Sequence, residues 1–554
     1  MKGMRSAAVI AAAAGAVLGA EAGADSTRRA ALAASSWCAP PAASPAPEPA
    51  PAPVLIDGLG YAGIEPDSAN AEARAWFAQG VRLVWAFDEV EAIRAFQQAQ
   101  RLDPGCALCF WGEAWARGPT INLQPRTEEL DAARAALRRA VALSSGLGQR
   151  DRMLIRAMRS RMGREAFRGD AYASAMEGLA RRFPEDDAIS VIAADARMVA
   201  APRGGLQPGS LTQQLLERVL ARSPDHSGAI HMYIHLTDWI DRQALAEPHA
   251  ERLGRIAPAA SHLVHMPSHT FYGIGRYADA AAVNVRAIAA DRAFIERARP
   301  AASDYRTGLL AHNMHFAMNS ALMRGDGQTA LSVAEQFRHR YLANGEGEGF
   351  IRLIGSAVWF SEGLHGAPDA VLASAEPGED DPVGRALRRY ARGEAMARAG
   401  DGAAVRAEAA AIRALREGPQ APALGETGSK LAEIAQLVLE GRAAMIAGDH
   451  AAAASAYRTA MERQIEADFS PDPPLWWYSV RRSLGAALLA AGEHGSAREQ
   501  FAASLRRWPN DALALYALAQ AEEALGDREA AASALARARA GWAGDLAAVP
   551  LTRI

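Results

Sequence analysis

The 554-residue chain is poor in several residue classes, and each shortage excludes a kind of protein. Its three cysteines are too few to hold a chain of this length together as a disulfide scaffold. Its 48 glycines and 29 prolines rule out a collagen-like or wholly disordered chain. With a formal net charge of −3, it has no basic excess to hold nucleic acid or an anionic membrane through bulk charge. We therefore expect no nucleic-acid partner.

The sequence also lacks the short motifs that mark common enzyme classes. It contains no phosphate-binding loop, no GxSxG nucleophile elbow and no HExxH zinc motif. Any catalysis would have to come from its histidines, so the sequence alone leaves open whether the protein is an enzyme.

Residues 1–24 are typical of an export signal peptide. Two basic residues precede an apolar stretch from Ser6 to Ala20, and a small-residue cleavage site ends at Ala24. The apolar stretch is shorter than the ~20 residues that a membrane-spanning helix needs, so we expect no permanent membrane span. These features predict a periplasmic or secreted mature protein.

Residues 25–66 include a proline- and alanine-rich tract at positions 39–53. Such a tract has no apolar face to bury, so we expect a disordered, semi-rigid tether here. Residues 67–554 contain no second linker of this kind. They are predicted to form a single domain.

A 34-residue period of small and apolar residues runs through the predicted domain, most regularly at 434–545. Small residues at positions 8 and 20 let two antiparallel helices approach closely, larger residues at 4, 11 and 24 fill the remaining space, and a proline at 32 ends the second helix. The period predicts an all-α fold, a tetratricopeptide-repeat (TPR) type α-solenoid, in which about ten helix pairs form a right-handed superhelix. The first unit carries Trp76, Gly80, Leu83, Ala92, Phe96, Ala99 and Pro104.

Several longer strings resemble a group of bacterial exported TPR proteins. They are CALCFWGEAWARGPTIN at 106–122, GAIHMYIH at 228–235, HLVHMPSHTFYGIGRYADA at 262–280, AHNMHF at 311–316 and PDPPLWWYSVRRSLGAALL at 471–489. The resemblance spans most of the predicted domain. It implies the TPR fold but no settled activity.

Histidine is concentrated in the central repeats at 227–342: nine of the 13 histidines lie between residues 226 and 315. When three units are counted from Ser227, Ser261 and Ala311, seven histidines fall at positions 2, 5 and 9. These spacings place the side chains on one face of the first helix of each pair, the face that looks into the concave groove of a TPR solenoid. The seven are His231, His235, His262, His265, His269, His312 and His315.

Imidazoles on one face of neighbouring helices are suited to bind a transition metal. Two histidines four residues apart give one ion two ligands, and helices packed ~8–10 Å apart bring equivalent positions within reach of each other. We therefore predict that the seven histidines bind copper, zinc or iron. An open coordination position would make a metalloenzyme with redox or hydrolytic chemistry. Two alternatives stay open: a groove that binds a peptide or partner protein without metal, and histidines that serve packing alone.

Further residues are candidates for contacts around the groove. Asp238 is a possible carboxylate ligand or hydrogen-bond partner of a ligating histidine, and Asn319 takes position 9 of the third histidine unit. An early unit offers Trp111, Glu113 and Trp115. A proline-rich interruption of the period precedes Trp477, Tyr478 and Arg481, which either fold over the groove or pack on a neighbouring repeat.

Cys106 and Cys109 form a CxxC pair at the expected start of a helix. The following residue is Phe110, which excludes a c-type haem site, and a zinc site would need a second pair that the sequence lacks. In an oxidising compartment the two thiols would form a redox-active local disulfide, bind copper or stay as buried thiols. The sequence does not choose between these outcomes.

Overall fold

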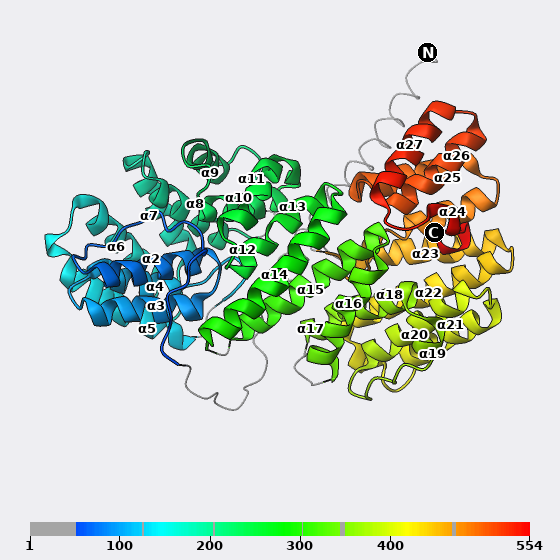
Figure 1. Cartoon of the computed structure of the whole chain (residues 1–554), viewed down its shortest axis with the longest axis horizontal. Helices are drawn as coiled ribbons and strands as arrows, with labels where there is room; N and C mark the ends of the chain where they lie inside the picture. Colours follow the sequence, from blue (N-terminus) through cyan, green and yellow to red (C-terminus); the bar gives the residue numbers. More distant parts are fainter. Residues whose placement is uncertain (1–50, 125–126, 203–204, 302, 344–348, 468–472) are drawn as a thin grey trace, which may run out of the picture.

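The computed structural model describes residues 51–124, 127–202, 205–301, 303–343, 349–467 and 473–554. Within these ranges the regular structure is helical, apart from one isolated β-bridge. Consecutive antiparallel helices pair and stack into an elongated body, with the N-terminal helices at one end and the C-terminal helices at the other (Figure 1). This confirms the predicted all-α, TPR-type solenoid. The predicted signal peptide at 1–24 lies outside the described residues.

The helices fall into an N-terminal, a central and a C-terminal group. The N-terminal group is α2 (Ala71–Trp85), α3 (Glu89–Leu102), α4 (Ala107–Ala116), α5 (Thr127–Leu143), α6 (Gln149–Arg161), α7 (Gly169–Arg182), α8 (Asp187–Ala200) and α9 (Leu211–Arg222). The central group is α10 (Ser227–Trp239), α11 (Glu247–Ile256), α12 (Ser261–His265), α13 (Pro267–Gly273), α14 (Tyr277–Ala298), α15 (Asp304–Arg324) and α16 (Gly327–Phe337).

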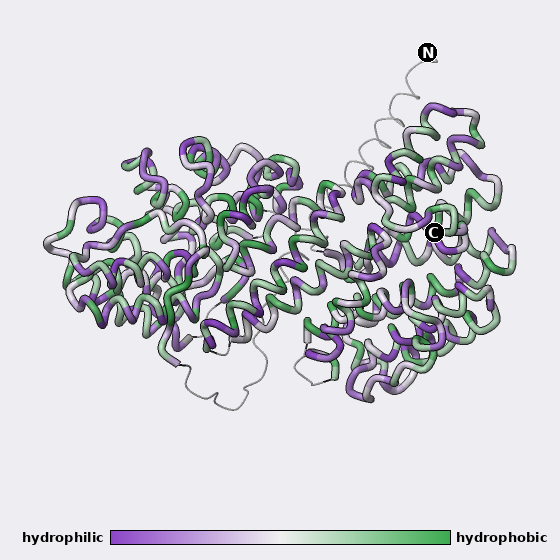
Figure 2. Tube along the Cα trace, viewed as in Figure 1, coloured by the Kyte–Doolittle hydropathy of each residue, from purple (hydrophilic) through white to green (hydrophobic). Residues whose placement is uncertain are grey.

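The C-terminal group is α17 (Phe350–Ile354), α18 (Ser356–His365), α19 (Pro368–Leu372), α20 (Pro382–Arg398), α21 (Gly402–Glu417), α22 (Gly425–Ile446), α23 (His450–Ala467), α24 (Arg481–Ala490), α25 (His494–Arg507), α26 (Ala512–Leu525) and α27 (Arg528–Gly541). Hydrophobic and hydrophilic stretches alternate along most helices (Figure 2), as expected when each helix buries one face. Of the helices in the described ranges, none combines the length and the apolar character needed to cross a membrane.

Close packing within several helix pairs depends on a glycine that faces an aromatic ring, at the repeat positions predicted from the sequence. A Cβ atom added to Gly80 would lie 2.7 Å from the ring of Phe96. The same addition at Gly485 would lie 2.6 Å from the ring of Phe501. Only a hydrogen fits at these two positions, so the paired helices are held at their shortest separation.

Residues 54–64, the last part of the predicted tether, form a packed segment, here called the strap. The prediction that the folded part begins near residue 67 is therefore wrong. Ile56 and Leu59 are buried. The backbone N–H of Tyr61 donates to Ser227 Oγ at the start of α10 (3.0 Å), and the Gly58 carbonyl accepts from the Ala259 N–H just before α12 (2.9 Å). Ile56, Leu59, Ala62 and Ile64 give this segment an apolar face to bury, which the Pro/Ala tract before it lacks.

The C-terminal repeats return to the centre of the chain. The backbone N–H of Ala543, just after α27, donates to the Arg324 carbonyl at the end of α15 (2.7 Å). The ring of Trp542 lies against Gly325, whose φ of 71° places it in the left-handed region that suits glycine. The strap, which precedes the repeats, and the last repeat therefore both contact the central helices.

The glycine–aromatic contact predicts opposite effects for two Gly→Ala substitutions in one hairpin. Gly485→Ala forces Phe501 to move in a packed interior, so we expect a loss of roughly 1–3 kcal/mol of unfolding free energy. Gly495→Ala, on the open side of α25 with no atom within 4 Å of the new Cβ, should gain roughly 0.5–1 kcal/mol through helix propensity. Thermal unfolding of both variants checks this, and equal effects would contradict it.

A pH prediction follows from His226, the N-cap of α10. Its Nδ1 accepts a hydrogen bond from the Ala229 N–H (3.2 Å). Burial lowers the pKa of His226 to about 4. Below about pH 6.5, this histidine gains a proton in the unfolded chain while it stays neutral in the folded chain. The free energy of unfolding therefore falls, by about 2 kcal/mol at pH 5. His226→Asn keeps a capping oxygen but does not titrate.

We expect this variant to lose less thermal stability than the wild type between pH 7.5 and pH 5, when both are measured without metal. The comparison concerns the two slopes, because the substitution also changes packing at neutral pH. Parallel stability curves would show that His226 is protonated equally well in the folded and the unfolded chain.

Candidate metal centre

Six of the seven predicted histidines form two groups of three. Within each group one nitrogen atom per histidine lies within 4.8 Å of the other two. The first triad is His231, His235 and His262; the second triad is His265, His269 and His312.

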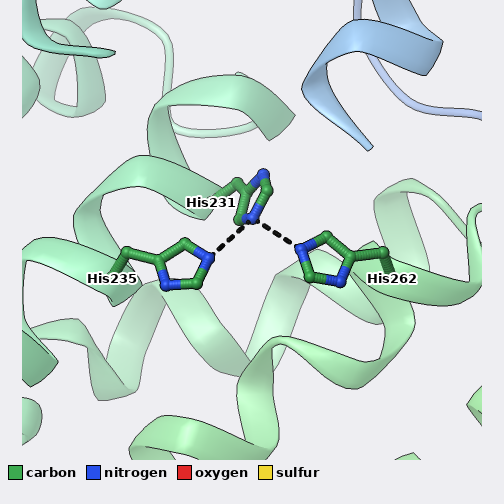
Figure 3. A group of neighbouring side chains, drawn as sticks. All are labelled: His231, His235 and His262. Atoms are coloured by element: carbon green, nitrogen blue, oxygen red, sulfur yellow. Dashed lines mark hydrogen bonds between the residues drawn. The ribbon is translucent and has the colours of Figure 1, made fainter. Parts of the chain in front are cut away.

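The first triad joins two helices. His231 and His235 lie one turn apart on α10, and His262 lies on α12. The Nε2 atom of His231 is 3.1 Å from Nε2 of His235 and 3.0 Å from Nε2 of His262 (Figure 3). The three rings therefore point their Nε2 atoms at one small region, as ligands of a single ion do.

The second triad repeats this arrangement one unit further along. His265 and His269 lie on α12 and α13, with their Nε2 atoms 3.0 Å apart. Pro267 separates the two short helices, because proline has no N–H to continue the helical hydrogen-bond ladder. His312 comes from α15, with its ring centroid 4.8 Å from that of His265.

The two triads follow one rule of the repeat. Each combines positions 5 and 9 of one unit with position 2 of the next unit. A helix brings positions 5 and 9 together, and the packing of neighbouring units brings position 2 to them. The rule explains why six histidines make two similar sites rather than one irregular cluster.

An oxygen atom fixes the tautomer of the first imidazole in each triad. His231 Nδ1 is 2.6 Å from the carbonyl oxygen of Trp85, which accepts and so places the ring proton on Nδ1. His265 Nδ1 is 2.7 Å from Oδ1 of Asn284, whose own NH2 group donates to the Ala280 carbonyl (2.8 Å) and so turns Oδ1 toward the ring. In both rings Nε2 is then left with its lone pair directed at the other two histidines, which is the form that binds a metal.

Asp238 lies near a third histidine, beyond hydrogen-bond distance. Its carboxylate lies 3.9 Å from Nδ1 of His269, and it also accepts a hydrogen bond from Gln243 (3.2 Å). A carboxylate beside the outer nitrogen of a histidine orients the ring and strengthens its inner nitrogen as a ligand. Asp238 therefore lies where a partner of a ligating histidine would lie.

Burial keeps three of the imidazoles, those of His231, His262 and His312, neutral. It lowers the pKa of His231 to about 3. Burial and then the neighbouring imidazoles hold the pKa of His262 and of His312 well below the usual value. Neutral imidazole is the ligand form of histidine, so these rings need lose no proton to bind an ion at neutral pH.

Two phenylalanines cover the triads. The ring centroid of Phe87 lies 4.4 Å from that of His231 and 5.2 Å from that of His262. Phe316 lies 5.0 Å from His265 and 4.9 Å from His269 in the same measure. Phe87 has a φ of 55°, a conformation that costs a bulky residue of order 1–3 kcal/mol and persists only where the surroundings impose it.

The prediction that these histidines face an open groove is wrong. Five of the six are buried, and only His312 is partly exposed. The sequence pattern placed them on the correct face of their helices, but Phe87 and Phe316 fill the space in front of that face. The imidazoles line the interior of the solenoid rather than its surface.

His315 joins neither triad, so the prediction that it shares a metal with the other six is not supported by the geometry. Its Nε2 lies 3.1 Å from Nδ2 of Asn319, which also donates to the carbonyl of Pro474 (3.1 Å). These two residues hold positions 5 and 9 of the third unit, where the earlier units have two histidines. With an amide at position 9, the third unit ties down the segment that follows α23 instead of building a third triad.

The early aromatic residues are structural and do not line a groove. Trp111 and Trp115 are buried and stack on each other, with ring centroids 5.3 Å apart. Glu113 is buried beside them and pairs with Arg117 (2.9 Å). Trp115 packs at 4.9 Å against Trp85, whose carbonyl holds His231, so this layer supports the first triad from behind.

The residues after the proline-rich interruption pack on neighbouring repeats, the second of the two arrangements considered for them. Trp477 and Tyr478 are buried and enclose the guanidinium of Arg482, which forms a buried ion pair with Asp511 (3.0 Å). Arg481 donates to Gln500 (3.0 Å) on α25. None of these three predicted residues contacts the triads.

Cys106 and Cys109 form a disulfide, one of the three outcomes open for the CxxC pair. Both residues are buried at the start of α4. The bond closes a loop of three residues, so it contributes little to the stability of the whole domain.

Three contributors to the site escaped the sequence reasoning: Trp85, Phe87 and Asn284. Trp85 acts through its backbone carbonyl, which carries no signal of residue type. The position of Phe87 depends on a turn with positive φ, and phenylalanine is not a residue type that predicts such a turn. Asn284 did leave a signal, because it is a lone amide in the apolar run AAAVNV, on a helix face that the repeat expects to be buried.

Comparisons with known proteins add little to this picture. The chain matches no protein-family model and no curated protein sequence. It is similar to the solved structure of a human IFIT1 dimer with m7Gppp-AAAA, at 13% identity over 86% of this chain and 91% of that chain, with a TM-score of 0.29. It is also similar to a structure of Naa15/Naa10 bound to HypK-THB, at 14% identity over 85% of this chain and 89% of that chain, with a TM-score of 0.22. Similarity this distant says nothing about a ligand or an activity.

Proposed function

We propose that this helical-repeat protein binds two transition-metal ions, one in each histidine triad. The observation that carries the proposal is the convergence of three imidazole nitrogens in each triad, twice in the same register of the repeat. Hydrogen bonds between imidazoles account for each close pair of nitrogen atoms, whereas a repeated metal site also accounts for a second group of three histidines in the same register. The oxygen partners of His231 and His265 add the outer contacts that ligating histidines need.

The ligand set narrows the choice of metal. Imidazole binds copper, zinc and iron well, whereas calcium and magnesium require oxygen ligands. Three protein ligands leave a coordination position open on each ion, which is the arrangement of reactive rather than purely structural sites. A metal-dependent enzyme is therefore a natural extension of the proposal.

The burial of the triads weakens the alternative of a peptide-binding groove that uses imidazoles as donors. Five of the six side chains are covered by neighbouring elements, so an extended peptide has no access to them without opening the domain. A partner protein bound elsewhere on the solenoid stays compatible with metal binding. A metal site and an interaction surface are separate properties of one scaffold.

We also propose that the protein works in the periplasm or outside the cell. The export signal expected in residues 1–24 is the basis for this, and the disulfide between Cys106 and Cys109 supports it, since such bonds persist in oxidising compartments. The size of the mature chain recovered from culture medium or periplasm tests the point. A cytoplasmic, full-length product would overturn it.

Metal stoichiometry tests the main proposal directly. We expect the untagged chain, loaded in turn with copper, zinc and iron and then desalted, to retain two ions of at least one metal, measured by mass spectrometry. His235→Asn removes a ligand of the first triad and His312→Asn one of the second, so each should retain one ion and the double variant none. His339→Asn, at an exposed histidine on the surface, is the matched control and should retain both.

Thermal unfolding of the metal-free variants checks that the substitutions leave the fold intact. The proposal fails if the wild type retains no metal, or if the double variant retains as much as the wild type.

Asn284 provides a second test, because it touches a ligand and not the metal. Asn284→Leu fills the same space but removes the oxygen that holds His265, so we expect metal affinity at the second triad to fall about 10–100-fold. Asn284→Asp restores an acceptor at that position and should bind nearly as tightly as the wild type. Competition with a chromogenic chelator measures both, and equal affinity for wild type and Asn284→Leu would contradict the role.

A further inference from the structure

The two triads are as close to each other as the rings within each triad. Ring centroids inside the triads are 4.7–6.2 Å apart. Between the triads, His235 lies 5.6 Å from His269, and His262 lies 5.8 Å from His265. His262 and His265 are also one turn apart on the same short helix, α12. No helix or apolar layer separates the two groups, so two bound ions would be immediate neighbours.

Exposure to solvent is uneven across the two triads. His231 and His265, the two rings held by oxygen partners, are fully buried at 0% exposure. His235 and His269, which face each other across the boundary, keep 5% and 6%, and His312, the one partly exposed member, lies 5.9 Å from His269 between ring centroids. Asp238, near His269, has a side chain that is 24% exposed. A small molecule from solvent would therefore reach the ions beside His269.

Charge favours one shared ligand at that boundary. All six triad members are imidazoles, so the protein supplies no negative charge in the ligand set itself. Two divalent ions would leave a large uncompensated positive charge in a buried site, which is costly unless an anion joins them. A single anion between neighbouring ions lowers this charge and also fills one open position on each.

The same considerations favour copper. Copper(II) binds nitrogen ligands more tightly than the other divalent first-row ions, and a set of neutral imidazoles also accepts copper(I), which halves the charge to be buried. No carboxylate is among the ligands, whereas sites built for two iron ions in helical proteins use several.

We propose that the two triads together form one dinuclear copper centre that takes a single small bridging ligand, of the class to which azide, hydroxide and dioxygen belong. This inference rests on the proposed function, because it needs an ion in each triad. It goes further in making the ions one functional unit. It assigns His235 and His269 to the entrance and Asp238 to the orientation of the ring at that entrance.

Electron paramagnetic resonance of the copper(II)-loaded full chain, with azide as the bridging probe, tests the proposal. We expect two copper ions per chain with a signal far smaller than the bound copper, because two copper(II) spins joined by a bridge cancel each other. Azide should saturate at one per copper pair. His312→Asn should restore a signal equal to its one remaining copper, and His339→Asn should behave as the wild type.

The outcomes distinguish a failure of the dinuclear centre from a failure of metal binding itself. Two copper ions per chain with full signal intensity in the presence of azide, or azide binding at one per copper, would mean independent sites. The dinuclear centre would then fall while the metal-binding function stands. Retention of two zinc or iron ions but no copper would overturn the inference in the same way. A wild type that retains no metal at all would overturn the proposed function as well.

Asp238→Asn gives a finer test of the entrance. The amide keeps the size of the side chain but removes its charge beside His269. With both triads loaded with copper, we expect a changed azide affinity, since the ring at the entrance loses its anionic partner. Unchanged azide affinity would remove Asp238 from the proposal.

Discussion

The contact between a carbonyl oxygen and the outer nitrogen of one histidine in each triad is the interaction on which the rest of the site depends. Without Trp85 O on His231, or Oδ1 of Asn284 on His265, either tautomer would be available to these rings. The oxygen selects the form in which Nε2 carries a lone pair. Both oxygens belong to rigid helices, α2 and α14, so the geometry is set before any ion arrives.

Without a bound ion, this preorganisation costs free energy of folding. Six imidazoles are taken from water, five of them are held with nitrogen atoms 3.0–3.1 Å from a neighbouring ring, and Phe87 is kept in an unfavourable backbone conformation to cover the first triad. The solenoid can carry such a cost because neighbouring repeats, the strap and the last repeat brace the central units on every side. A bound ion would offset it by replacing close nitrogen–nitrogen contacts with coordinate bonds.

Much of the fold and part of the site could be predicted from the sequence, for a physical reason. The helix period and the glycine–aromatic pairs, such as Gly80 with Phe96, are local, and they specify the hairpin without reference to distant residues. The register of histidines at positions 5 and 9 is equally local. The sequence could not predict which residues cover the histidine face of these helices. The residues that cover it, Phe87 and Phe316, come from distant parts of the chain, and the strap that closes on α10 looked like part of a tether.

The third histidine unit shows how one repeat rule gives different outcomes. Units one and two place histidine at positions 5 and 9 and borrow position 2 from the following unit, and each makes a triad. Unit three has His315 at position 5 but Asn319 at position 9, where the amide donates to the Pro474 carbonyl. An amide nitrogen that donates to a carbonyl cannot join a group of converging imidazoles, so the series of triads ends there. The side chain at position 9 thus distinguishes a unit that builds a histidine triad from one that anchors the next segment.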